Sequence, residues 1–255
     1  MGLPGSAIDN EMALHCHVRC FYNQAIVART GEHSNMRIVF FGDSLTEGVY
    51  GVDYVGRIAA SLSGHTVINR GHGGDTSYDL LRRLGQDVLA LQLDGVFVMI
   101  GVNDASAILD PSRRPNLPAI SADTFRDNMR DLLSKLTRTG CRVWVALEPA
   151  ELNPALVETV RTLNDHTGDI CRELQIPTLD VFSTLLPEVV PQRRRSLLAR
   201  YSLALARRIW PSPNYDLWRK AGGYSYSFDG VHLTENGAQR IADQVVRFLR
   251  LNGIE

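Results

Sequence analysis

The chain has 255 residues, of which 44% are apolar and 22% are charged, a composition typical of a soluble globular protein that buries a core. Its formal net charge of −1 argues against general nucleic-acid binding, which normally requires a basic surplus. The sequence contains no run of about 18 apolar residues, so it predicts no membrane-spanning segment.

The first 35 residues are polar and weakly patterned. They lack the basic start and apolar stretch of a secretory signal, so a cytoplasmic location is the default expectation. The opening MGLPGS matches the myristoylation pattern, which is too short to be specific. The stretch HCHVRC at 15–20 has no second Cys/His pair to complete a zinc site, and the four cysteines are irregularly spaced. We expect residues 1–35 to form an accessory helix or a loose tail, with the folded domain covering 36–255.

From Met36 onward, short apolar runs alternate with amphipathic segments. The runs are rich in Val, Ile and Phe, which is typical of buried strands. They cover residues 37–41, 65–69, 95–100, 142–147 and 176–182. The helical patterns cover residues 53–62, 77–92, 123–138, 154–174 and 235–251. Strands that alternate with crossover helices predict an α/β fold, with a parallel sheet covered by helices on both faces.

A basic and aromatic stretch at about 185–228 interrupts this alternation. Between Leu185 and Gly222 it holds seven Arg and one Lys against Glu188 and Asp216, a balance of +6. Leu197, Leu198, Tyr201, Leu205 and Ile209 trace one apolar helical face in it. We expect this insertion to pack over the core with its charges in solvent. Binding to an anionic membrane surface or to a partner is the alternative.

Small and polar residues follow the first three predicted strands. Residues 42–44 follow the first strand, NRGHGGDTS (69–77) follows the second, and residues 101–104 follow the third. Open α/β sheets bind ligands at the carboxyl ends of their strands. Ser44, Gly74 and Asn103 are therefore expected to converge on one crevice.

A serine in that crevice needs a base, because a hydroxyl is a weak nucleophile until a neighbouring group takes its proton. Of the seven histidines, His232 alone follows a carboxylate by three residues, in a segment that leads into the last helix. On a single turn, Asp229 can hold Nδ1 of His232 and leave Nε2 to face the serine. Read as structure alone, Asp229 would be a turn former and His232 a surface residue.

Acyl transfer also requires donors that stabilise the negative charge on the former carbonyl oxygen. The backbone amides of Ser44 and Gly74 and the side-chain amide of Asn103 are candidates. A glycine at 74 lets the backbone approach a substrate without a Cβ atom in the way. As simple turn formers, Gly74 and Asn103 would need no such role.

These segments resemble, in order, the four sequence blocks of the SGNH hydrolases, also called the GDSL esterase/lipase family. The matching blocks are GDSL (42–45), NRGHGGDTS (69–77), GVND (101–104) and DGVH (229–232), and the resemblance extends from Met36 to about Leu251. It implies a three-layer αβα sandwich with a five-stranded parallel sheet in flavodoxin-like strand order. It also implies ester chemistry on small-molecule substrates, with no metal or organic cofactor.

Carried onto this chain, the resemblance makes Ser44 the nucleophile, His232 the general base and Asp229 the orienting carboxylate. Gly74 and Asn103 complete an oxyanion hole with the amide of Ser44. Asp43 and Asp104 are expected to brace the two loops rather than to act chemically.

Three alternatives remain at this stage. A metal-dependent phosphoesterase could use an oxygen-rich edge made of Asp43, Asp75, Asn103, Asp104, Asp229 and His232, although such sites usually contain several histidines. An acyltransferase could use the same triad with an acceptor other than water. A non-enzymatic binding module could have kept the fold.

Overall fold

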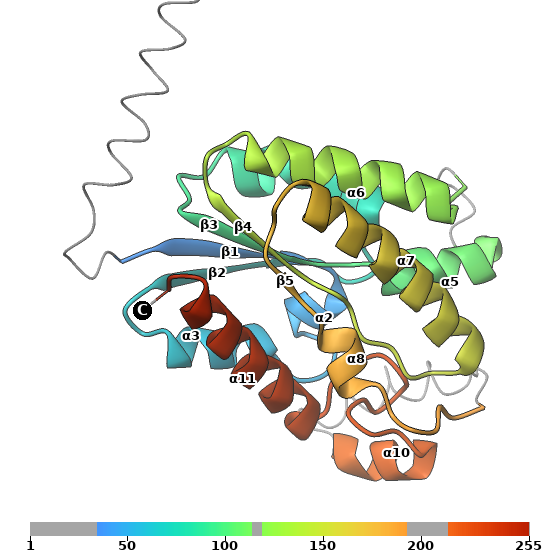
Figure 1. Ribbon diagram of the computed structural model, residues 1–255. Helices are drawn as coiled ribbons and strands as arrows, with labels where there is room; N and C mark the ends of the chain where they lie inside the picture. The colour runs from blue at the N-terminus through green and yellow to red at the C-terminus, as the bar shows by residue number, and fades with distance from the viewer. Residues whose placement is uncertain (1–34, 114–118, 193–213, 255) are drawn as a thin grey trace, which may run out of the picture. The chain divides into compact units, whose positions relative to one another are not determined.

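Five parallel strands form a sheet in the computed structural model, which describes residues 35–113, 119–192 and 214–254 (Figure 1). The strands are β1 (Arg37–Gly42), β2 (Thr66–Gly71), β3 (Gly95–Met99), β4 (Arg142–Ala146) and β5 (Thr178–Leu179). They lie in the order β2-β1-β3-β4-β5, with parallel pairing throughout. The α/β fold and the flavodoxin-like strand order are therefore confirmed.

Strand β3 is apolar along its whole length, and β1 is apolar after its first residue, Arg37, because both faces of the sheet are covered. Phe40 and Phe41 of β1 are fully buried, and so are Val98 and Met99 of β3. The rings of Phe40 and Phe97 lie 5.0 Å apart across the two strands. Parallel strands covered on both faces carry continuous apolar runs rather than alternating ones.

The helices form one layer on each side of the sheet (Figure 1). On one side, α3 (Tyr54–Ser61) packs against α11 (Glu235–Leu251). The other side carries α4 (Ser77–Leu84), α5 (Val102–Leu109), α6 (Ala122–Thr137) and α7 (Pro154–Glu173). In α11, Ile241, Val245 and Leu249 are fully buried at four-residue spacing, which is the expected inward face.

The long helices begin where a polar side chain can cap them. Asp53 accepts a hydrogen bond from the backbone N–H of Gly56 before α3, and Asn153 does the same for Leu156 before α7. Thr234 caps α11 through the N–H of Gly237. Such caps satisfy backbone donors that the first turn leaves unpaired. The cap of α11 also fixes the end of the segment that carries His232.

The structure corrects three of the expected elements. The helix expected at 77–92 is α-helical only to Leu84 and continues as a π-helical turn, η1 (Gly85–Leu89). The strand expected at 176–182 pairs only at 178–179, because the Asp180 side chain caps a short helix, α8 (Val181–Leu185). Residues 102–104, expected in a loop, form the first turn of α5.

The remaining described elements are short. They are α2 (Ser44–Glu47), η2 (Pro111–Arg113) and α10 (Tyr215–Gly222). Residues 1–34 and the central part of the basic insertion, 193–213, lie outside the described residues, so the expectations for these segments remain predictions. Within the described ranges, no helix is both long and apolar enough to cross a membrane.

Candidate active site

Ser44 is the first residue of α2 and directly follows β1 at the carboxyl edge of the sheet. Asp43 caps this short helix by accepting a 3.0 Å hydrogen bond from the backbone N–H of Leu45. The neighbouring strand β2 ends at Gly71, where a Cβ atom would lie 2.0 Å from the backbone nitrogen of Glu47. Only glycine therefore allows β2 to end so close to the helix that carries Ser44.

A chain of hydrogen bonds joins Ser44, His232 and Asp229. Oγ of Ser44 lies 3.0 Å from Nε2 of His232, and Nδ1 of His232 lies 2.9 Å from Oδ2 of Asp229. An ionised carboxylate can only accept, so Nδ1 carries a proton and Nε2 is left to accept the hydroxyl proton of the serine. The three residues predicted from DGVH and GDSL are thus brought together.

The segment from Tyr226 to Thr234 folds into a tight turn that orients His232. Oδ1 of Asp229 accepts hydrogen bonds from the backbone N–H groups of Val231, at 3.1 Å, and His232, at 2.8 Å. The backbone N–H of Phe228 donates to the carbonyl oxygen of His232 at 3.0 Å. One oxygen of Asp229 therefore shapes the turn while the other faces the imidazole.

Aromatic rings surround the imidazole of His232. Tyr50 meets it edge to face with centroids 4.4 Å apart, and Phe228 stacks on it at 6.0 Å. Tyr215, from the start of α10, stacks on Phe228 with ring centroids 4.4 Å apart. These rings limit the orientations that the imidazole can adopt.

Asn103 points its side-chain amide toward the loops that follow β1 and β2. Its Nδ2 donates to Oδ2 of Asp43 at 2.8 Å and to the backbone carbonyl of Asp75 at 3.0 Å. Both N–H bonds of the amide thus have protein acceptors, and a substrate oxygen would have to share or replace one of them. Gly74, with φ of 86°, lies in the left-handed region that favours glycine.

Arg83 of α4 ties these loops together. Its Nε lies 2.6 Å from Oδ2 of Asp75, and its Nη2 donates to the carbonyl oxygen of Gly42 at 2.8 Å. The guanidinium also lies 4.4 Å from the ring centroid of Phe41. One side chain therefore connects the ends of β1 and the second glycine loop, a role that the sequence analysis missed.

Three fully buried carboxyl groups lie behind Ser44: those of Asp43, Asp104 and Glu148. Burial raises the pKa of Asp43 to about 6, partly offset by the amide of Leu45 and by His232. Burial likewise raises the pKa of Asp104 to about 7, although Ser77 donates to this carboxylate through both its backbone N–H and its hydroxyl. Asp104 thus connects α5 to the start of α4, in line with its expected bracing position.

The acidic residues considered for a metal site have protein partners instead. Asp229 bonds His232, Asp104 bonds Ser77, and Asp75 pairs with Arg83. In the ranges that the structure covers, His, Cys, Asp and Glu side chains form no group of three or more that could hold a metal ion.

Two buried glutamates that follow β4, Glu148 and Glu151, were also missed as site residues. Glu148 accepts a 2.6 Å hydrogen bond from the backbone N–H of Val102, and Glu151 accepts from the backbone of 225–227. The sequence does contain a signal for them. EPAE (148–151) directly follows the predicted strand at 142–147, and so lies at the edge of the sheet where the polar loops after the first three strands also lie.

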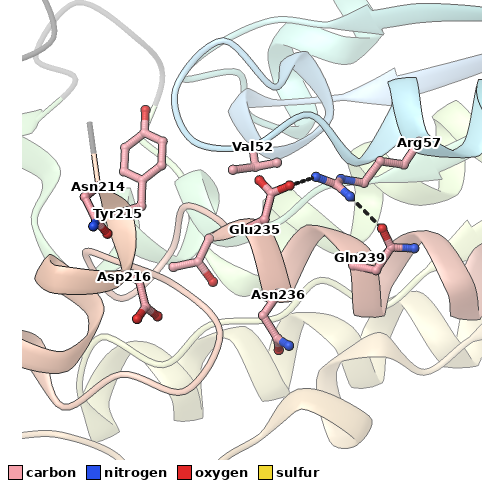
Figure 2. A pocket seen from close by; sticks show the side chains of 9 residues that line it. Val52, Arg57, Asn214, Tyr215, Asp216, Glu235, Asn236 and Gln239 are labelled. Atoms are coloured by element: carbon pink, nitrogen blue, oxygen red, sulfur yellow. Dashed lines mark hydrogen bonds and ion pairs between the residues drawn. The ribbon is translucent and has the colours of Figure 1, made fainter. Parts of the chain in front are cut away.

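A cavity of about 500 Å³ lies beside the turn that carries His232 (Figure 2). Its walls are Val52 and Arg57, residues 214–216 at the start of α10, and four residues at the start of α11, including Thr234 and Gln239. Arg57 reaches across it to Glu235 and, at 2.5 Å, to Gln239. The lining combines an aromatic ring with amide, carboxylate and guanidinium groups.

Comparisons with known proteins identify the family of the chain. Residues 40–240 match the model of the GDSL-like Lipase/Acylhydrolase family. An acetylxylan esterase from Geobacillus stearothermophilus is 25% identical over an alignment 172 residues long that covers 58% of this chain and 75% of that protein. A second match, 30% identical over 95 residues, covers 37% of this chain and 28% of the zinc transport protein ZntB from Cronobacter sakazakii.

Solved structures show the same fold. The acetylxylan esterase Axe2 from Geobacillus stearothermophilus superposes with a TM-score of 0.64 at 20% identity, covering 87% of this chain and 96% of that one. A lipase/acylhydrolase from Enterococcus faecalis gives a TM-score of 0.57 at 21% identity, covering 85% and 96%. Because the family model spans most of the chain and includes the GDSL, GVND and DGVH segments, the chain belongs to the GDSL-like lipase/acylhydrolase family of SGNH hydrolases and is a carboxylic ester hydrolase.

Proposed function

We propose that this enzyme hydrolyses carboxylic esters through a covalent acyl-enzyme formed on Ser44. The observation that carries the proposal is the hydrogen-bonded series from Ser44 Oγ through His232 to Asp229. It supplies a nucleophile, a base and an orienting carboxylate in contact with one another, which is the arrangement that serine acyl transfer requires.

In the first half-reaction, Oγ of Ser44 bonds to the ester carbonyl carbon while its proton moves to Nε2 of His232. The tetrahedral intermediate then collapses, the bond to the alcohol oxygen breaks, and His232 returns the proton to the departing alcohol. In the second half-reaction, water adds to the acyl carbon and gives a proton to His232, which passes it to Ser44 as the acid is released.

The oxyanion donors in this proposal are the backbone N–H groups of Ser44 and Gly74 and the amide of Asn103. The position of Asn103 between Asp43 and Asp75 holds its amide at the junction of the two loops. The intermediate would then share one N–H of Asn103 with an existing acceptor. Each such donor contributes about 3 kcal/mol to transition-state stabilisation in known enzymes.

The substrate class that we propose is an acetyl or other short acyl ester of a hydroxylated alcohol such as a sugar. An acetylxylan esterase is among the relatives of this chain. The alcohol departs on the side of His232. The cavity in Figure 2 is lined by Thr234, two residues after His232, and by Tyr215, whose ring stacks on Phe228 next to that imidazole. An aromatic ring and a polar rim suit a hydroxylated ring better than a long alkyl chain.

The deciding experiment compares wild type with Ser44→Ala on p-nitrophenyl acetate, butyrate and octanoate in the presence of EDTA. We expect activity that persists in EDTA, falls with acyl length and disappears with the serine. A fluorophosphonate probe should label the wild-type protein and not the variant. Turnover that is indifferent to Ser44, or that EDTA abolishes, would contradict the proposal. Adding a sugar acceptor distinguishes hydrolysis from acyl transfer.

A further inference from the structure

Two glutamates that follow β4 lie three residues apart and are both fully buried, but their surroundings are opposite. The carboxylate of Glu151 is saturated with donors. Oε1 accepts from the N–H groups of Tyr226, at 3.0 Å, and Ser227, at 2.7 Å, and from the Ser227 hydroxyl at 2.7 Å. Oε2 accepts from the N–H of Ser225 at 2.8 Å. Four donors stabilise the ionised form, so Glu151 is a carboxylate.

Glu148 has only one donor. Its Oε2 accepts the N–H of Val102 at 2.6 Å, whereas its Oε1 is buried and has no hydrogen-bond donor. Among the ion pairs of the described residues, none includes Glu148. An ionised carboxylate in this position would be costly, because a buried charge requires a partner or several donors.

The charged group that most affects Glu148 is another carboxyl group, that of Asp43. The two lie near each other because Val102 and Asn103, adjacent residues of α5, donate to Glu148 and Asp43 respectively. Asp43 uses its two oxygens as acceptors, Oδ1 for the N–H of Leu45 and Oδ2 for the amide of Asn103. Two adjacent carboxyl groups cannot both be ionised without strong repulsion, so one of them holds a proton. The donors favour the charge on Asp43 and therefore the proton on Glu148.

We propose that Glu148 is a positioning residue that carries a proton on Oε1 and donates it to Asp43, which then holds the amide of Asn103 beside Ser44. Its contribution to catalysis rests on the proposed ester hydrolysis. Its protonation does not, because it follows from burial and contacts alone. The role belongs to Glu148 and not to Glu151, although both glutamates are equally buried.

The charged and titratable groups around the pair agree with this assignment. Burial raises the pKa of Glu148 well above its ordinary range, and the negative charges of Asp43 and Asp104 raise it further. The charge of His232 lowers the pKa of Asp43, whereas that of Asp75 raises it. The charge of Glu148 also contributes to raising the pKa of Tyr54 and of Tyr226, so both side chains lie near it.

The test is a pair of matched amide substitutions, Glu148→Gln and Glu151→Gln. A glutamine at 148 keeps an acceptor for Val102 and an N–H donor for Asp43, so we expect kcat on p-nitrophenyl acetate within about threefold of wild type near neutral pH. A glutamine at 151 places an amide N–H against backbone donors, so we expect a loss of about tenfold or more in kcat, a lower Tm, or both.

The pH dependence of kcat distinguishes a proton-carrying role of Glu148 from a role in packing alone, which would not change that dependence. In the wild type, loss of the proton from Glu148 places two carboxylates together, and kcat should fall at alkaline pH with little change in KM. This alkaline step should be absent from Glu148→Gln. A third variant, Glu148→Leu, removes the donor while filling the space and should lower kcat at all pH values.

Infrared difference spectroscopy tests the proton independently of activity. The wild-type spectrum minus that of Glu148→Gln should contain the carbonyl stretch of a protonated carboxylic acid, and the corresponding spectrum for Glu151→Gln should not. Absence of this band, or a loss of activity in Glu148→Gln equal to that in Glu151→Gln, would overturn the proposal. If the wild type hydrolyses no ester, the proposed function fails, and the infrared band still decides the state of Glu148.

Discussion

Nε of Arg83 lies 2.6 Å from Oδ2 of Asp75, with both side chains about 85% buried, so helix α4 holds the glycine-containing loop after β2 through a largely desolvated ion pair. The same guanidinium donates to the carbonyl oxygen of Gly42, two residues before Ser44. Two segments that are distant in the sequence are thereby held at a fixed separation by one rigid planar group.

Replacement of Arg83 tests this role. A lysine keeps the charge but not the fork geometry, so Arg83→Lys should lose either the Gly42 or the Asp75 contact. We expect kcat on p-nitrophenyl acetate to fall by about tenfold, with a smaller change in KM. The exposed neighbour Arg82 provides the matched control, since Arg82→Lys should leave kcat unchanged. Equal kinetics for the two variants would remove Arg83 from the site.

Asp229→Asn should retain the turn and lose most of the activity. An asparagine oxygen can still accept the backbone N–H groups of Val231 and His232, but its amide cannot accept the proton on Nδ1. We expect kcat to fall by about 10³ to 10⁴-fold, because the imidazole then favours the wrong tautomer. The comparison is Asp180→Asn, which keeps a helix cap remote from Ser44. Circular dichroism should show both variants folded.

The ring of Phe228 is expected to matter more for catalysis than the ring of Tyr215. Phe228 is 3% exposed and stacks directly on His232, so Phe228→Ala should cost about 3 kcal/mol of stability and also lower kcat. Tyr215 contacts His232 only through Phe228. Tyr215→Ala should leave hydrolysis of p-nitrophenyl acetate within about twofold of wild type.

Tyr215 also lines the cavity, which gives it a separate test. If the cavity receives a sugar, Tyr215→Ala should raise KM for acetylated xylooligosaccharides by about tenfold, while p-nitrophenyl acetate, which is too small to reach the ring, is unaffected. Steady-state kinetics on the two substrates provide the measurement. A parallel change in both KM values would place the alcohol elsewhere.

Asp104 should make the stability of the protein depend on pH in an unusual direction. Burial raises its pKa to about 7 in the folded state, against an ordinary value of 3.8 for an exposed Asp in the unfolded chain, so the folded protein binds more protons than the unfolded chain between these limits. The free energy of unfolding therefore falls as pH rises from about 4 to about 7. Relative to Asp104→Asn, wild type should lose on the order of a few kcal/mol over this range.

Urea unfolding at pH 5 and pH 8 measures this difference. The control is Asp169→Asn, which alters an exposed ion pair with Arg172 and should show no comparable pH-dependent difference. A wild-type protein that gains stability relative to Asp104→Asn at pH 8 would contradict the assignment.

The strands of the sheet and the placement of Asp229 beside His232 could be predicted from the sequence, because both depend on local patterns. Apolar runs such as RIVFF form strands in most environments, and the turn DGVH places a carboxylate and an imidazole on one side by itself. Helix α5 could not be predicted in this way. It begins after Gly101, which has a φ of 146° and no side chain to cap the helix, so the usual sequence signal of a helix start is missing.

The hydrogen-bonding partners of the buried acidic residues also could not be predicted from local sequence patterns. Glu148 meets Asp43 and Val102 only because β4, β1 and the start of α5 converge at one edge of the sheet. A pattern in the sequence identifies a glutamate after a strand. Whether that glutamate is an acid or a carboxylate depends on how many donors the tertiary structure brings to it.

Ser44 and His232 are separated by 188 positions in the chain. During synthesis, the serine emerges long before the imidazole that would activate it, and α11, whose cap Thr234 follows His232, is made after both. In the proposed mechanism, the nascent polypeptide therefore has no activated nucleophile while these 188 positions are being translated. On this proposal, Ser44 becomes reactive only after the segment that carries His232 has folded beside it and α11 has packed against α3, so folding itself is the step that activates the nucleophile.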